Sequence, residues 1–179
     1  MTTRKIAVFF YGLFMDMSLL HHRGLVPSHP QIACLDGYDI AIGDRATLVA
    51  HAEAQVYGVV TSLTYMAIDT LYAEPSVADY RPEAVFVTLG NGCQVPALCY
   101  NLPQIVIGTQ HNTAYALKLL ELAQTLGFPR SYLDRLQGLA QYDGAVHTHR
   151  QSTRTASAGA TKPCPHAEQT CVAGVALAP

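Results

Sequence analysis

Glu74 is the acidic residue whose position in the sequence favours acid–base chemistry. It lies in the segment LYAEPSVADYRPEAV, between Ala73 and Pro75 and close to other apolar residues. Asp and Glu together make up only 13 of the 179 residues, so a carboxylate among apolar neighbours stands out. Desolvation favours the neutral form of a carboxyl group and so brings it toward the range of a general base. The alternative is that Glu74 ends a helix on the surface, and composition alone does not separate the two interpretations.

The segment AVFFYGLFMD, residues 7–16, is the second feature that could take part in chemistry. Its apolar run ends at Tyr11 and Gly12, and a tight turn there could hold a ligand. A secretory signal is the alternative, because Arg and Lys precede the run. However, Asp16 interrupts it, His-His-Arg follows in place of small residues, and it is too short to span a membrane. We therefore expect a buried strand that is ended by Gly12.

The overall composition limits the class of protein. Half of the residues are apolar and 13% are charged, which is typical of a globular chain with one domain and a core of its own. The formal net charge is −2 and no basic run is present, so we expect no nucleic-acid partner. The five cysteines are an odd number without disulfide-scaffold spacing, which favours a reducing compartment. We expect a cytoplasmic protein with no membrane partner.

Other residue types offer weaker chemistry. The sequence has no Gly-x-Ser-x-Gly elbow, no phosphate-binding glycine loop and no dinucleotide fingerprint. Cys164, His166 and Cys171 could bind zinc, and His147 and His149 could add ligands. The first three residues lie in the predicted tail and have no evident fourth ligand, so we predict no metal site and keep structural zinc as the less favoured alternative.

The elements that must position these residues are mostly strands first and helices late, which favours an α+β fold. Residues 5–11 have the continuous apolar pattern of a buried strand. The segment IACLDGYDIAIG predicts a strand, a turn at Asp36-Gly37 and a second strand. Two more strands are predicted in RATLVAHAEAQVYGVVTSL, and the second is centred on residues 56–60. Asn91-Gly92 marks the turn of a hairpin in EAVFVTLGNGCQVPALCYNL.

Helix signals complete the pattern. Asp16 is a predicted N-cap for a short helix over residues 17–22, and Thr64 caps a helix that stops before Pro75. Apolar residues recur at helical spacing over residues 112–122, and a further helix begins at Ser131. From residue 147 the composition becomes rich in Ser, Thr, Ala, Gly and Pro. We therefore predict a domain over residues 1–146 and a poorly structured C-terminal tail over residues 147–179.

Taken in order, these segments resemble the gamma-glutamylcyclotransferase-like family, including its AIG2-like branch. The loop Tyr11-Gly12-Leu13-Phe14 stands where the family usually has Tyr-Gly-Ser-Asn or Tyr-Gly-Thr-Leu. VYGVVTSL places Gly58 at the family's glycine, and Glu74 followed by Tyr80-Arg81 and EAVFV keeps the family's order and spacing. GNGCQVPALCY matches the next hairpin, which ends at Tyr100. The resemblance covers residues 6–100.

The chain departs from the family pattern at three places. Leu13 replaces a polar residue after Tyr-Gly, and Pro75 replaces the glycine that follows the glutamate. Asp69 stands five residues before Glu74 instead of three. Leu13 and Phe14 make the loop unusually apolar, which favours a hydrophobic group beside the γ-glutamyl part of the substrate.

The resemblance implies a gamma-glutamylcyclotransferase-like fold, a small mixed β-barrel or sheet with flanking helices. It also implies a cofactor-independent enzyme, of the transferase or amine-lyase type, that cyclises a γ-glutamyl amine or peptide to 5-oxoproline and releases the amine. By analogy Glu74 takes the proton from the α-amine and then protonates the departing amine. The other site residues that we expect bind the substrate: Tyr11, Gly12, Leu13, Phe14, Tyr80 and Arg45.

The resemblance implies roles for these residues in the expected site. Backbone N–H groups of the loop would stabilise developing negative charge, while Tyr11 and Tyr80 line the pocket and the Tyr80 hydroxyl lies near Glu74. Arg45 is the candidate for binding the α-carboxylate, and a surface arginine is the alternative. Two other functions remain open: a non-catalytic small-molecule-binding or interaction domain on the same fold, and a related acyl or amine-lyase step. We expect a monomer or homodimer.

Overall fold

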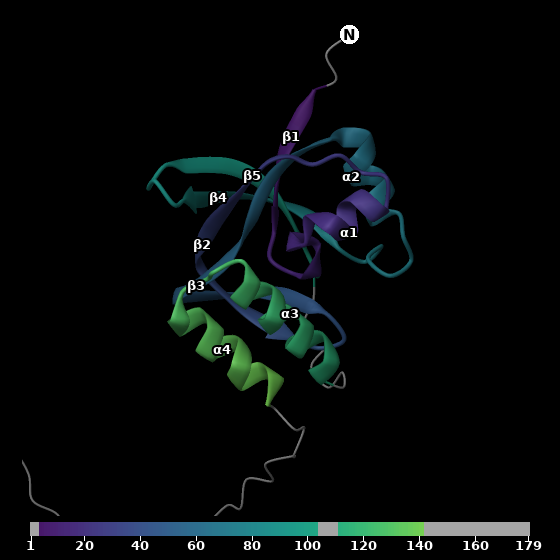
Figure 1. Ribbon diagram of the computed structural model, residues 1–179. Helices are drawn as coiled ribbons and strands as arrows, with labels where there is room; N and C mark the ends of the chain where they lie inside the picture. Colours follow the sequence, from purple (N-terminus) through teal and green to yellow (C-terminus); the bar gives the residue numbers. More distant parts are fainter. Residues whose placement is uncertain (1–3, 104–110, 142–179) are drawn as a thin grey trace, which may run out of the picture. The chain divides into compact units, whose positions relative to one another are not determined.

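Five strands form a closed barrel in the computed structural model, which describes residues 4–103 and 111–141 (Figure 1). The strands are hydrogen-bonded in the order β1-β3-β2-β4-β5. Closure of the barrel gives the apolar side chains a common interior. The strand bounds are Lys5–Phe10 (β1), Ser28–Ile42 (β2), Ala46–Thr64 (β3), Arg81–Leu89 (β4) and Gln94–Asn101 (β5).

The first strand is buried as its apolar run predicts. β1 pairs antiparallel with β3 and parallel with β5, so it has a neighbour on each side. Val8, Phe9 and Phe10 are each at most 3% exposed. The expected strand over residues 5–11 is confirmed to within one residue, and Tyr11, directly after it, is also buried.

The predicted turn at Asp36-Gly37 is wrong, because β2 continues through it as one strand of 15 residues. The pairing with β3 shifts register between Asp36 and Tyr38, and Gly37 has a φ of +80°. A left-handed glycine allows an irregularity of this kind without ending the strand. The two strands predicted after Arg45 are likewise one strand, β3, of 19 residues.

Gly58 lies on β3 where this strand packs closely against the end of β1. A Cβ atom built at this position would lie 2.3 Å from the carbonyl oxygen of Phe10 and 2.6 Å from the ring of Phe9. No side chain fits there without movement of the β1 backbone. The glycine therefore lets the two strands approach directly before the Tyr11-Gly12 loop.

Short helices follow the first strand and the third. The 3₁₀ helix η1 (Leu13–Met15) leads into α1 (Met17–His22), and α2 (Tyr65–Tyr72) follows β3. Both predicted caps are confirmed: the Asp16 carboxylate accepts from the N–H of Ser18 at 2.9 Å, and the Thr64 hydroxyl accepts from the N–H of Ala67 at 3.2 Å. These caps satisfy N–H groups at the helix starts.

The second half of the chain also has the predicted elements. β4 and β5 form the expected hairpin, with Gly92 at a φ of +82° in its turn. The helices α3 (Thr113–Thr125) and α4 (Arg130–Ala140) lie side by side beneath β2 and β3 in Figure 1. On α4, the ring of Tyr132 packs 5.4 Å from that of Tyr57 on β3.

None of the helices in residues 4–103 and 111–141 is both long and apolar enough to cross a membrane. The predicted C-terminal tail and its cysteine and histidine residues lie outside the described residues, so the zinc alternative stays a prediction. Within the described part of the chain, no group of three or more His, Cys, Asp or Glu side chains is placed to hold a metal ion.

Candidate active site

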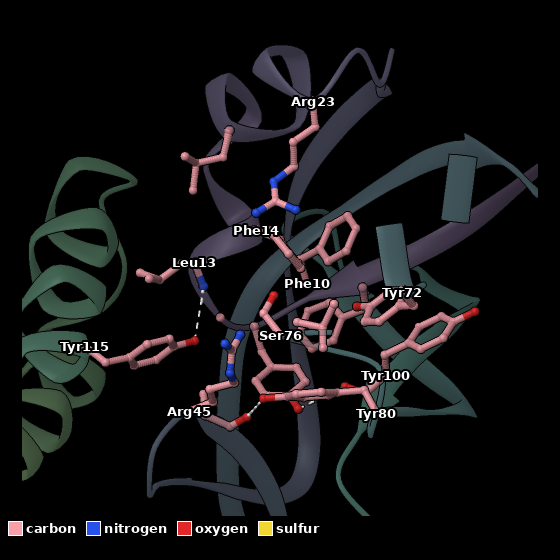
Figure 2. Close-up of a pocket in the computed structure, with 16 residues that line it drawn as sticks. Phe10, Leu13, Phe14, Arg23, Arg45, Tyr72, Ser76, Tyr80, Tyr100 and Tyr115 are labelled. Carbon is pink, nitrogen blue, oxygen red and sulfur yellow. Dashed lines mark hydrogen bonds between the residues drawn. The ribbon is translucent and has the colours of Figure 1, made fainter. Parts of the chain in front are cut away.

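A cavity of about 190 Å³ lies where β1 ends, between the Tyr11-Gly12 loop and the strands β3 and β5 (Figure 2). This volume lies below the roughly 300–1,000 Å³ of pockets for drug-sized ligands, so the cavity can take only a small ligand. The cavity draws on segments that are far apart in sequence, since its lining runs from β1 to α3. The lining residues are Phe9, Phe10, Tyr11, Gly12, Leu13, Phe14, Leu19, Arg23, Arg45, Ala46, Tyr72, Ser76, Val77, Tyr80, Tyr100 and Tyr115.

Half of the residues that line the cavity are aromatic. The rings of Tyr72 and Tyr100 stack with centroids 3.6 Å apart and an interplanar angle of 8°. The ring of Phe14 meets Phe10 edge to face at 6.0 Å and Tyr72 at 6.4 Å. Such contacts hold the rings in fixed positions. Phe14, which was predicted as a site residue, therefore has its side chain in the cavity wall. The stacked pair of Tyr72 and Tyr100 was not among the predicted site residues.

The hydroxyl groups of the predicted tyrosines are bound to other parts of the protein. Tyr11 donates to the carbonyl oxygen of Tyr100 at 3.0 Å and to Oδ1 of Asn101 at 3.2 Å. Tyr80 donates to the carbonyl oxygen of Ala46 at 2.5 Å. The expectation that the Tyr80 hydroxyl serves Glu74 is therefore wrong, because the backbone of β3 uses it. Burial raises the pKa of both phenols, so they stay neutral donors at physiological pH.

The backbone N–H of Leu13 is directed at the hydroxyl oxygen of Tyr115 at 3.4 Å (Figure 2). This hydrogen bond is long, so an incoming ligand oxygen can replace it at small cost. Gly12 is also in contact with the same hydroxyl, since a Cβ atom at Gly12 would lie 2.7 Å from it. Tyr115 sits on α3, beyond the residues 6–100 that the family resemblance covers, and only its three-dimensional position shows its connection to the loop.

The charge of the cavity lining is positive. Arg23 and Arg45 both line it, and no Asp, Glu or His does so among the described residues. Arg45 comes from the turn between β2 and β3 and lines the cavity, and its role as the partner of an α-carboxylate stays a prediction. Arg23, the residue after α1, was missed. Two guanidinium groups in an aromatic-lined cavity favour an anionic ligand, because carboxylates pair with guanidinium groups in a two-pronged geometry.

Glu74 lies beside the cavity and does not line it. It follows α2, and its carboxylate forms an ion pair with the guanidinium of Arg23. The side chain is 40% exposed, so the apolar neighbours in the sequence do not enclose the carboxylate as expected. Its neighbours in the chain, Ser76 and Val77, do line the cavity. Arg23 thus connects Glu74 to the site.

The arrangement has the parts for binding a small anion and for moving a proton at its edge. The rings give the cavity an apolar wall, the guanidinium groups attract negative charge, and the N–H of Leu13 offers a donor from the main chain. The carboxylate of Glu74 is paired with Arg23, which lines the cavity, and can act as an acid–base group at its edge. These features fit chemistry that needs positioning and one proton carrier.

Residues 8–119 match the family model described as gamma-glutamyl cyclotransferase, AIG2-like. The match takes in more than half of the chain and includes every residue that lines the cavity. A comparison of the sequence with curated proteins finds no match.

Solved structures with the same fold were also found. A structure described as gamma-glutamyl cyclotransferase aligns with a TM-score of 0.61 at 18% identity, over 75% of this chain and 87% of its own. An uncharacterized protein from Homo sapiens aligns with a TM-score of 0.60 at 18% identity, over 74% and 86%. YkqA from Bacillus subtilis gives 0.60 at 23% identity, over 76% and 54%. These likenesses confirm the predicted barrel with flanking helices.

Proposed function

Because the chain belongs to the gamma-glutamyl cyclotransferase family in its AIG2-like form, we propose that it cyclises a γ-glutamyl amine or peptide to 5-oxoproline and releases the amine. The observation that carries this proposal is the position of Glu74, which is joined through Arg23 to a small, positively charged cavity at the end of β1. The reaction requires a proton carrier next to a site for an anion, and these two parts adjoin here.

The chemistry needs no group beyond the side chains and the main chain. The substrate carries its own nucleophile, the α-amine, which arrives protonated. Glu74 accepts one of its protons, the amine forms a bond to the γ-carbonyl carbon, and the amide C–N bond breaks. The departing nitrogen takes the proton back from Glu74. The second proton on the ring nitrogen also passes to the departing amine, which leaves as an ammonium ion.

The cavity contributes by holding the substrate in a folded conformation. Closure of a five-membered ring is intramolecular, so positioning can supply several of the ~7–11 kcal/mol that proximity makes available. In this proposal the guanidinium of Arg45 binds the α-carboxylate. The N–H of Leu13 turns from the Tyr115 hydroxyl to the oxygen of the γ-carbonyl, where negative charge develops. Glu74 must move from the edge toward the α-amine.

The test is release of 5-oxoproline from a panel of γ-glutamyl amines and dipeptides, with the Glu74→Gln variant as the comparison. Product from the wild type alone supports both the reaction and the role of Glu74. Product from both proteins removes Glu74 from the mechanism. If neither protein gives product and both are folded, the cyclotransferase proposal fails.

A second candidate function is a non-catalytic domain that binds a small anion. The ion pair between Glu74 and Arg23 favours it, because this carboxylate is partly exposed and already occupied. Calorimetric binding of a γ-glutamyl compound without turnover would support this candidate. For either function we place the protein in the cytoplasm, because five cysteines without disulfide spacing fit a reducing compartment.

A further inference from the structure

Arg23 makes two contacts that bear on how the site selects its ligand. Its guanidinium pairs with the carboxylate of Glu74, and it lies over the ring of Phe14, with Cζ 5.2 Å from the ring centroid. Figure 2 shows the side chain reaching from α1 toward the ring of Phe14. The ring supports the guanidinium from one side. The charged group is therefore held at the cavity by a contact that does not involve Glu74.

The ion pair itself is easily exchanged. The side chains of Arg23 and Glu74 are 35% and 40% exposed, and pairs in contact with water contribute little to stability. A ligand carboxylate offers Arg23 the same geometry that Glu74 offers. Replacing one carboxylate by another at Arg23 costs little, and it releases Glu74 from its only ion pair among the described residues.

The rest of the cavity leaves room for such a ligand. Arg45 forms no ion pair with any carboxylate in the described part of the chain, and no acidic side chain lines the cavity there. The two guanidinium groups come from separate parts of the chain, the residue after α1 and the turn between β2 and β3. A ligand with a carboxylate for each of them would neutralise the site, whereas a ligand with one carboxylate would leave Arg23 bound to Glu74.

We infer that Arg23 is a specificity-determining and positioning residue that exchanges the Glu74 carboxylate for a carboxylate on the departing part of the substrate. This inference rests on the proposed function. The preferred substrate is then a γ-glutamyl amino acid with a free carboxylate, and its binding releases Glu74. The freed carboxylate takes the proton from the α-amine and returns it to the departing nitrogen, so the products are 5-oxoproline and the amino acid.

A matched pair of substrates tests the exchange. γ-Glutamylalanine and γ-glutamylethylamide differ only in the carboxylate of the departing amine. For the Arg23→Gln variant, kcat/KM for γ-glutamylalanine should fall on the order of ten- to a hundredfold, as expected for loss of a hydrogen bond to a charged group. The value for γ-glutamylethylamide should not fall, because this substrate offers Arg23 no carboxylate and the variant leaves Glu74 unpaired. Arg23→Lys should recover part of the loss, because it keeps the charge but not the two-pronged geometry.

Arg130→Gln is the matched control, since Arg130 forms an exposed ion pair with Asp134 on α4, away from the cavity. It should leave kcat/KM for both substrates unchanged. If the role of Arg23 were purely structural, Arg23→Gln would instead lower kcat/KM for both substrates by the same factor. That outcome, or equal kcat/KM of the wild type for the two substrates, overturns the inference and leaves the proposed function standing.

Binding of unreactive analogues separates the two proposals. Glutaryl-alanine and glutaryl-ethylamide lack the α-amine and cannot cyclise, so calorimetry measures their affinity directly. Because Glu74 competes with the ligand for Arg23, Glu74→Gln should raise the affinity for glutaryl-alanine by about two- to fivefold. The affinity for glutaryl-ethylamide should stay the same. Weaker or unchanged binding of glutaryl-alanine overturns the exchange. If no substrate yields 5-oxoproline, the proposed function fails, and these affinities alone decide whether Arg23 exchanges carboxylates.

Discussion

The hydroxyl oxygen of Tyr115 and the backbone N–H of Leu13 lie 3.4 Å apart, although 102 residues separate them in the chain. The same hydroxyl also occupies the space beside Gly12 that a Cβ atom would need. One phenol from α3 therefore fixes the position of the loop after β1, and it holds the main-chain donor until a ligand replaces it. The loop depends on α3 as much as on its own sequence.

Gly12→Ala should lower activity by displacing the Tyr115 hydroxyl, because the new methyl group would lie 2.7 Å from that oxygen. Tyr115→Phe removes the oxygen, and the nearest ring atom, Cζ, is then 4.0 Å away, an ordinary contact. The double variant should therefore recover most of the kcat/KM that Gly12→Ala loses. Steady-state kinetics of the four proteins gives the coupling between the two positions.

Tyr115→Phe alone serves as the control for that cycle and should retain at least a tenth of the wild-type rate, since the donor is the N–H of Leu13 and not the phenol. If the two changes reduce activity independently, with no recovery in the double variant, the steric relation between Gly12 and Tyr115 does not govern the loop.

Glu74→Gln should reduce kcat for 5-oxoproline release by about 10²–10⁴, the usual contribution of a positioned acid–base group. Because the side chain of Glu74 is partly exposed, we expect the variant to fold, and its thermal melting checks this. Glu53→Gln, an exposed glutamate on β3 that does not line the cavity, is the matched control and should keep the wild-type kcat. A Glu74→Gln protein with full activity would contradict the proposed mechanism.

Arg45→Gln should raise KM for a γ-glutamyl substrate by roughly tenfold or more, because the α-carboxylate loses a charged partner in a mainly apolar site. The proposed role in binding predicts a smaller effect on kcat. Rates measured across substrate concentration separate the two parameters. An unchanged KM would mean that the α-carboxylate is held elsewhere.

Gly58→Ala should destabilise the barrel by about 3 kcal/mol or more, because the added methyl group overlaps the carbonyl of Phe10 and the ring of Phe9. For a domain of this size the melting temperature should fall by roughly 6–12 °C. Gly138→Ala provides a control of opposite sign. Nothing lies within 4 Å of a Cβ at Gly138, which is inside α4, so alanine should raise stability by about 0.5–1 kcal/mol.

The ion pair between Asp39 and Arg135 should make the attachment of α4 sensitive to acid. Burial acts to raise the pKa of the Asp39 carboxyl, but hydrogen bonds from Arg135 and from the Ile40 N–H outweigh it and lower the pKa below its usual value. A lowered carboxyl pKa gives stability that is complete above the unfolded value of about 3.9 and is lost as pH falls through the folded value. Because Arg135 is half-exposed, the pair contributes no more than about 1 kcal/mol.

Thermal melting of the wild type and Asp39→Asn from pH 7 to pH 2.5 checks this prediction. The difference in melting temperature should stay constant down to about pH 5 and shrink below pH 4. Asp134→Asn removes the carboxylate of a more exposed pair and should give a smaller difference throughout. A difference that grows as the pH falls would have the wrong sign for a carboxyl group with a lowered pKa.

Elements with local signals could be predicted from the sequence. The caps at Asp16 and Thr64 and the turn at Asn91-Gly92 depend on neighbouring residues only, and each is where the pattern placed it. The turn at Asp36-Gly37 could not be resolved in this way. The same dipeptide serves a hairpin turn or a strand irregularity, and the long pairing of β2 with β3 decides between them.

The site was only partly predictable for the same reason. Gly12 and Arg45 line the cavity from turns, and the sequence patterns around these turns identified both as candidates. Arg23 and Tyr115 belong to no local sequence motif. They become part of the site only because the fold places α1 and α3 near the end of β1. The surroundings of Glu74 were misjudged because apolar neighbours along a chain do not determine which side chains enclose a carboxylate in space.

The parallel pairing of β1 with β5 sets a condition on how the chain reaches its folded state. Val8 pairs with Leu98, and Phe9 with Cys99, so the barrel closes through contacts between residues about 90 positions apart. A chain emerging from the ribosome cannot complete the first strand's pairing until the fifth strand has been made. Non-local closure of this kind slows folding, and the apolar first strand, AVFF, stays without its second neighbour during that interval. The time before closure is when a nascent chain is most exposed to self-association.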